Sequence, residues 1–180
     1  ARLALLPLKP QLFLSASAIG FYGDRGTEEL DEKSSVGTGF LAETTQRWEA
    51  ATLPAEQAGI RTVRIRIGLV LSKKGGALKK MLLPFKLGVG GVLGSGNQYM
   101  SWIALHDLVR IIDFAILNQS IQGSINAVSP VAVTNREFTQ ALAKELHRPA
   151  IFPIPAFALR LIFGEMADAL LLSSTRVIPR

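Results

Sequence analysis

Cysteine is absent from this chain of 180 residues, and histidine occurs only twice. Without a thiol the chain can form no disulfide, no thiolate nucleophile and no zinc–thiolate site. His106 and His147 lie far apart in the sequence and no carboxylate-rich segment accompanies them, so we expect no metal site. A chain without cysteine suits a reducing compartment, and we expect the cytoplasm or the stroma or matrix of an organelle.

Long uninterrupted apolar runs are also absent. The most apolar late stretch, residues 150–172, is broken by Pro153, Pro155, Arg160, Glu165 and Asp168. The first ten residues do not show the charged start, apolar core and cleavage site of a secretory leader. We therefore expect neither a membrane span nor a membrane partner.

Acidic residues are the minority among the charged ones. Lys and Arg number 20 against 14 Asp and Glu, which gives a net charge of +6. An excess of positive charge raises the question of nucleic-acid binding. The positive charges are spread along the chain, however, except for two lysine pairs within residues 73–80, and no recognition motif accompanies them. A solvated helix face explains these lysines better than a nucleic-acid site, although a basic interaction module over residues 73–86 stays an alternative.

Strand-like and helix-like segments alternate along the chain. The pattern predicts strands over residues 11–17, 62–71, 98–105 (with a turn) and 124–128, and helices over 40–58, 77–87, 106–118, 135–147, 156–163 and 166–172. Polar residues 24–38 and glycine-rich residues 88–96 are predicted loops. Strands separated by helices of this length indicate parallel pairing, so the predicted fold class is α/β, with one sizeable core.

The segment Gln11–Asp24 carries the strongest local signal. Apolar residues 12–14 fit a strand buried on both faces, and the small residues 15–18 follow where that strand should end. Ligands of open α/β sheets bind outside the carboxyl ends of the strands, so this position predicts a ligand site. Tight packing of small side chains at the strand end is the alternative interpretation.

The glycine signature of a dinucleotide fold is missing. No GxGxxG turn follows a strand and opens a helix, and the glycines of residues 88–96 come too late to form one. A dinucleotide-binding fold begins with that strand and turn. We therefore expect that the chain is the C-terminal part of something longer, and the resemblance described next implies that the main cofactor-binding loop lies outside it.

Several motifs occur in an order that resembles a known family. They are LSASAIGFYGD, a helix with RWE, a long segment from RIRIGLVLSKKGG to LHDLV, and GSINAVSPVAVTNREFTQALAKELHRP. Over nearly all of residues 11–180 the chain resembles the epimerase-like, YfcH-type branch of the atypical extended short-chain dehydrogenases/reductases, within the NAD-dependent epimerase/dehydratase family.

This resemblance implies a Rossmann-type parallel sheet with a smaller substrate-binding region. Residues 1–72 would be the C-terminal part of the dinucleotide-binding domain, and residues 73–180 mostly the substrate-binding region with returning Rossmann elements. The implied partners are a dinucleotide, NADP(H) rather than NAD(H), and a small-molecule substrate, with a homodimer as a further implication.

The same resemblance assigns roles to residues. Ser17 matches the active-site serine at the end of the fifth strand of the family's sheet. The implied cofactor contacts are Ser15, Ala16, Arg66, Gly68, Leu69 and Val70. The implied substrate contacts are Gly94, Ser95, Gln98 and Trp102.

One departure from the family pattern bears on chemistry. Classical members carry Tyr-x-x-x-Lys on the helix after the fifth strand, where the tyrosine transfers the proton and the lysine lowers its pKa. Alignment on Glu49 puts Leu41 and Thr45 at these two positions, and neither can do that work. Tyr22, on the loop past the strand, is the nearby phenol that could substitute, so Ser17 and Tyr22 are the catalytic candidates. Packing of Tyr22 under the loop is the alternative.

Two functional hypotheses follow beside the basic module. The first is an NAD(P)-dependent epimerase or reductase that acts on a nucleotide-sugar-like or other small hydroxylated substrate with an altered acid–base group. The second is a cofactor-binding sensor or scaffold that kept the dinucleotide site and lost turnover. The missing Tyr/Lys pair favours the second, and the retained Ser17 region and pocket glycines favour the first.

Overall fold

Three parallel strands in the order β1–β3–β7 form the centre of the computed structural model, which describes residues 2–180. β1 spans Leu12–Ala18, β3 spans Arg61–Ile67 and β7 spans Gly123–Ala127. β3 pairs with both neighbours, and the register sets Arg66 beside Ser17 on one side and beside Asn126 on the other. The predicted α/β class with a parallel sheet is confirmed.

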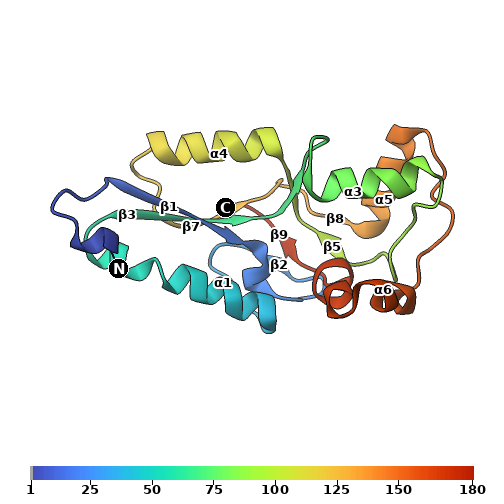
Figure 1. Cartoon of the computed structure of the whole chain (residues 1–180), viewed down its shortest axis with the longest axis horizontal. Coiled ribbons are helices and arrows are strands. Elements are labelled where there is room, and N and C mark those ends of the chain that lie inside the picture. Colours follow the sequence, from blue (N-terminus) through green and yellow to red (C-terminus); the bar gives the residue numbers. More distant parts are fainter. Residues whose placement is uncertain (1) are drawn as a thin grey trace.

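Helices cover both faces of this sheet (Figure 1). α4 (Leu105–Leu117) lies over one face, and α1 (Phe40–Ala50) and α2 (Leu53–Gln57) lie over the other. Alternate strand residues point to opposite faces, so the two interfaces differ in chemistry. The face under α4 is the apolar core, formed by Val63, Ile65, Ile103, Leu108, Ala115 and Ala127. The face under α1 carries polar side chains.

The end of α4 is fixed to the sheet by Arg61. Its guanidinium donates to the carbonyl oxygens of Ala115, Asn118 and Ile121 at 2.9–3.2 Å. The last carbonyls of a helix have no partner within the helix, and a cation there also suits the negative end of the helix dipole. Arg61 therefore ends α4 and joins it to the first residue of β3.

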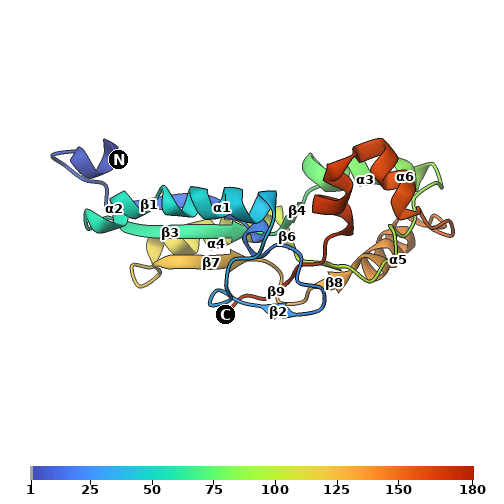
Figure 2. The same cartoon turned by 90° about the horizontal axis from the view of Figure 1, so that it is seen from below.

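A second group of elements lies beyond the carboxyl ends of β1 and β3 (Figure 2). It contains α3 (Gly76–Lys86), α5 (Asn135–Leu146), α6 (Ala156–Phe163) and a π-helical segment, Ala167–Leu172. β5 (Tyr99–Met100) pairs antiparallel with β8 (Val133–Thr134). β4 (Leu69–Leu71) pairs parallel with β6 (Trp102–Ala104) and links this group to the sheet.

The C-terminal segment returns to the loop after β1. There β9 (Arg176–Val177) pairs parallel with β2 (Glu29–Leu30). Two short 3₁₀ helices, Arg2–Leu5 and Ile19–Tyr22, complete the described elements. None of the helices in residues 2–180 is of sufficient length and apolar character to traverse a lipid bilayer.

Three of the elements predicted from the sequence were wrong. The predicted loop over residues 24–38 contains β2, which forms only because β9 returns to it. The predicted helix over residues 40–58 is two helices, with Pro54 in the first turn of α2, where a missing N–H costs nothing. The predicted strand over residues 62–71 breaks at Gly68, where the chain leaves β7 and begins to pair with β6.

The break at Gly68 predicts a stability effect. A Cβ there would lie 2.7 Å from the Ser101 carbonyl oxygen and 2.8 Å from a methyl group of Val128. We expect Gly68→Ala to lower the free energy of unfolding by about 1–3 kcal/mol, as measured by urea denaturation. Gly75→Ala adds the same methyl group where no atom lies within 4 Å, so it should cost less, about 0.5 kcal/mol, from the weaker N-cap of α3. Equal losses in the two variants would contradict the steric argument.

Candidate functional site

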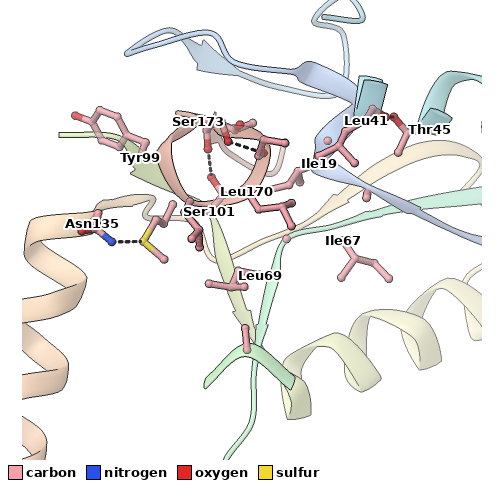
Figure 3. A pocket seen from close by; sticks show the side chains of 18 of the residues that line it. Ile19, Leu41, Thr45, Ile67, Leu69, Tyr99, Ser101, Asn135, Leu170 and Ser173 are labelled. Atoms are coloured by element: carbon pink, nitrogen blue, oxygen red, sulfur yellow. Dashed lines mark hydrogen bonds between the residues drawn. The ribbon is translucent and has the colours of Figure 1, made fainter. Parts of the chain in front are cut away.

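A cavity of about 440 Å³ lies at the carboxyl ends of β1 and β3. This is the edge at which open α/β sheets bind ligands. The sheet side of its wall is formed by Ala18, Ile19, Gly20, Ile67, Gly68 and Leu69. The opposite side comes from α3, β5, the start of α5 and the π-helical segment, so the cavity lies between the sheet and the second group of elements (Figure 3).

α1 presents one of its faces to this cavity. Leu41, Thr44, Thr45 and Trp48 all line it, at the spacing of neighbouring helix turns. Leu41 and Thr45 are the positions that alignment on Glu49 matches to the family's tyrosine and lysine. The Thr45 hydroxyl donates to the Leu41 carbonyl oxygen at 2.7 Å, so it is turned back onto its own helix. The α1 wall therefore offers no titratable side chain to the cavity.

Ser17 lies under α1 and does not line the cavity. Its hydroxyl donates to Oε1 of Glu49 at 2.8 Å, and the residue is only 6% exposed. Nε and Nη2 of Arg66 donate to the two oxygens of the same carboxylate, each at 2.8 Å. The Ser124 hydroxyl adds a longer bond to Oε2 at 3.3 Å. The serine thus completes a buried ion pair between the sheet and α1.

Tyr22 joins the same cluster from the loop after β1. Its phenol accepts from Nη1 of Arg66 at 2.9 Å and donates to Oδ1 of Asn126 at 2.8 Å. The side chain is fully buried, and burial raises its pKa in spite of the charge of Arg66. The guanidinium also lies 3.6 Å from the centre of the Phe21 ring. These contacts support the packing role that the sequence left open as the alternative.

The structure separates the other residues that the resemblance singled out. Gly68 and Leu69 line the cavity, whereas Ser15, Ala16, Arg66 and Val70 are not part of its wall. Of the implied substrate contacts, Gly94, Ser95, Gln98 and Trp102 lie outside the wall. The Gln98 amide still holds two residues of the wall in place, because it donates to the carbonyl oxygens of Leu93 and Leu171, both at 3.0 Å.

Much of the far wall was not anticipated from the sequence. It includes Met81 of α3, Tyr99 and Met100 of β5, and Leu170 and Leu171 of the π-helical segment. Met81, Tyr99 and Met100 lie within the long segment that carries the family resemblance, but the resemblance assigned no role to them.

Comparison with known sequences identifies relatives over most of the chain. Residues 154–180 match a family model described as a domain of unknown function (DUF1731). Over 166 residues the chain is 48% identical to epimerase family protein MT2273 of Mycobacterium tuberculosis (strain CDC 1551 / Oshkosh), which covers 92% of this chain and 55% of that protein. The chain thus spans about half the length of the curated relatives that it matches.

Solved structures are similar to the fold as a whole. Human epimerase family protein SDR39U1 (isoform 2), crystallised with NADPH, gives a TM-score of 0.91 at 35% identity over 99% of this chain and 60% of that chain. The nucleoside-diphosphate sugar epimerase of Corynebacterium glutamicum gives a TM-score of 0.73 at 39% identity over 96% of this chain and 40% of that chain. These similarities confirm the predicted Rossmann-type sheet.

The buried ion pair predicts a large cost when one partner loses its charge. The side chains of Arg66 and Glu49 are 6% and 11% exposed. We expect Glu49→Gln to destabilise the protein by about 3 kcal/mol, because the Arg66 charge stays buried without its counter-ion. The matched control is Asp168→Asn in the exposed pair Arg160–Asp168, where water screens the charges. Urea denaturation should show little change in this control, and a similarly small change in Glu49→Gln would contradict a structural role for the pair.

The same carboxylate predicts a dependence of stability on pH. Burial alone would raise the pKa of Glu49, but the hydrogen bonds from Arg66, Ser17 and Ser124 and the Arg66 charge bring it below its ordinary value of 4.5. A pKa lower in the folded than in the unfolded chain stabilises the fold above the unfolded value. That contribution is lost as the pH falls through 4.5 toward the lower folded pKa. Unfolding midpoints across this range should fall more steeply in the wild type than in Glu49→Gln, and equal slopes would contradict the assignment.

Proposed function

Since the chain belongs to the epimerase family of the extended short-chain dehydrogenases/reductases, we propose that it forms the nicotinamide end and the substrate pocket of an NADP(H)-binding protein. The observation that carries the proposal is the cavity at the carboxyl ends of β1 and β3, walled by the α1 positions of the family's catalytic pair. The similarity to a human relative crystallised with NADPH supports it.

The residues present fit a nicotinamide ring. Ala18, Gly20 and Gly68 keep the strand ends almost bare, which leaves room for a flat ring against the backbone. Leu41 and Leu69 supply apolar contact from two sides. In this proposal the bound cofactor supplies the hydride, and these residues bind and orient the ring and exclude water from it.

In the same proposal Ser17 is a positioning residue. It acts through Glu49 on α1, which carries one wall of the cavity.

The proposed division of the chain follows the fold: residues 1–72 contribute β1 and β3, and residues 73–180 contribute most of the far wall and return to the sheet through α4 and β7. The cytoplasm or an organelle matrix stays the proposed location, and a homodimer the proposed assembly.

A second candidate function is cofactor binding without turnover. The observation that favours it is the α1 wall, where Leu41 and the back-bonded Thr45 offer no proton donor or acceptor of suitable pKa. Oxidation of NADPH in the presence of a carbonyl substrate would support the enzyme. Tight NADPH binding with no oxidation across a broad panel of carbonyl compounds would support the sensor.

We expect the protein, expressed at its full natural length, to bind NADPH with micromolar affinity and NADH more weakly, as measured by cofactor fluorescence. Leu41→Trp fills the cavity beside the strand ends and should weaken NADPH binding about tenfold, a loss of about 1.4 kcal/mol. Phe40→Trp is the matched control, because Phe40 is 78% exposed on the same helix and does not line the cavity. Absence of binding by either nucleotide would overturn the proposal.

A further inference from the structure

No charged side chain lines the cavity anywhere in residues 2–180. A nucleotide sugar carries two phosphates and several hydroxyl groups, which have to be matched by cations or hydrogen-bond partners when they leave water. Protein sites for phosphates use arginine, lysine or a row of backbone N–H groups. Arg176 lies outside the wall: its guanidinium is 5.0 Å from the centre of the Tyr99 ring and pairs with Glu29. Arg66 is paired with Glu49 beneath α1. The wall formed by this chain therefore offers no charged side chain to neutralise a diphosphate.

Several polar side chains in the wall are already hydrogen-bonded within the protein. The Ser101 hydroxyl donates to the Thr175 carbonyl oxygen at 2.9 Å and accepts from the Val177 N–H at 2.8 Å. The hydroxyl of Thr175 in turn donates to the Gly23 carbonyl oxygen at 3.0 Å. These bonds hold the C-terminal segment against the sheet and leave the two hydroxyls little capacity for a ligand.

Asn135 and Ser173 are engaged in the same way. Oδ1 of Asn135 accepts from the Leu93 N–H at 2.8 Å, and its amide nitrogen donates to the Met100 sulfur at 3.5 Å. The Ser173 hydroxyl donates to the Ala169 carbonyl oxygen at 2.9 Å. Figure 3 shows these side chains bonded to their neighbours around the cavity. Among the described residues, the hydroxyls of Thr44 and Tyr99 and the indole N–H of Trp48 are the polar side-chain groups of the wall that such bonds do not occupy.

The remainder of the wall is apolar and comes from several elements. Leu69 of β4, Met81 of α3, Met100 of β5 and Leu170 of the π-helical segment meet around the cavity. Methionine adapts its shape to irregular apolar ligands and makes favourable contacts with aromatic rings. A wall of this kind gains free energy from apolar area removed from water and loses it for each hydroxyl left without a partner.

We propose that this pocket takes an uncharged, largely apolar molecule with a single carbonyl or hydroxyl group, and not a nucleotide sugar. The inference rests on the proposed function in one respect, because the ligand would lie beside the nicotinamide ring. The proposed ligand class differs from the substrate class in the name of the Corynebacterium glutamicum relative, a nucleoside-diphosphate sugar epimerase. The unoccupied donors of Thr44, Trp48 and Tyr99 are the groups of the wall that would bind the one polar atom of such a ligand.

The test uses two probes on the full-length protein: prodan, a neutral naphthyl ketone whose emission shifts to the blue in apolar surroundings, and UDP-glucose. We expect saturable prodan binding that UDP-glucose does not displace. Leu170→Gln, in the pocket wall, should weaken prodan binding about fivefold. Leu161→Gln is the matched control, because Leu161 is 86% exposed on the adjacent α6 and lies outside the wall.

A second pair of variants guards against a fold defect in the first. Met81→Gln changes a residue of the wall. Its control is Leu83→Gln, because Leu83 on the same helix is 63% exposed and lies outside the wall. Prodan binding that is unchanged in both wall variants, or displacement of prodan by UDP-glucose, would overturn the inference.

NADPH binding is titrated in parallel: NADPH binding without prodan binding overturns the ligand class alone. Prodan binding with the expected variant pattern but no NADPH binding overturns the proposed function and leaves the ligand class standing.

Discussion

The bidentate ion pair between Arg66 and Glu49 is the constraint on which the rest of this structure depends. It joins the central strand of the sheet to α1 across a buried interface, where an unmatched charge would be costly. Ser17, Ser124 and Tyr22 supply further hydrogen bonds to the two groups. Because α1 also carries the wall with Leu41 and Thr45, this pair sets one side of the cavity without touching it.

The elements could be predicted from the sequence where the signal is local. The helix over residues 135–147 is one case, since Thr134 and Glu137 form the capping box that their spacing predicts and the structure ends this helix at Leu146. The break at Gly68 could not be predicted in this way, because it depends on which strand pairs with each half. Pairing partners lie far away in the sequence, and no local pattern encodes them.

The site was harder to predict than the fold, for a geometric reason. Successive strand residues point to opposite faces, so a motif can place Ser17 at the end of β1 without revealing whether its hydroxyl meets the cavity or the underside of α1. The alternation of Arg64 and Arg66 with Val63 and Ile65 did carry that information, because it predicts one polar and one apolar face. The apolar wall from Met100 and Leu170 had no comparable signal, since such residues resemble any other core segment.

The position of Trp48 at the cavity has a spectroscopic consequence. The chain has two tryptophans, and only Trp48 lines the cavity, whereas Trp102 lies in β6 outside the wall. Trp48 is 55% exposed, so its indole meets both solvent and the cavity. A ligand that enters the cavity replaces water with apolar contact at the indole ring of Trp48, which changes the fluorescence emission of this residue. Trp48 is therefore an intrinsic optical reporter of occupancy, and the overlapping emission of Trp102, outside the wall, adds to the same spectrum.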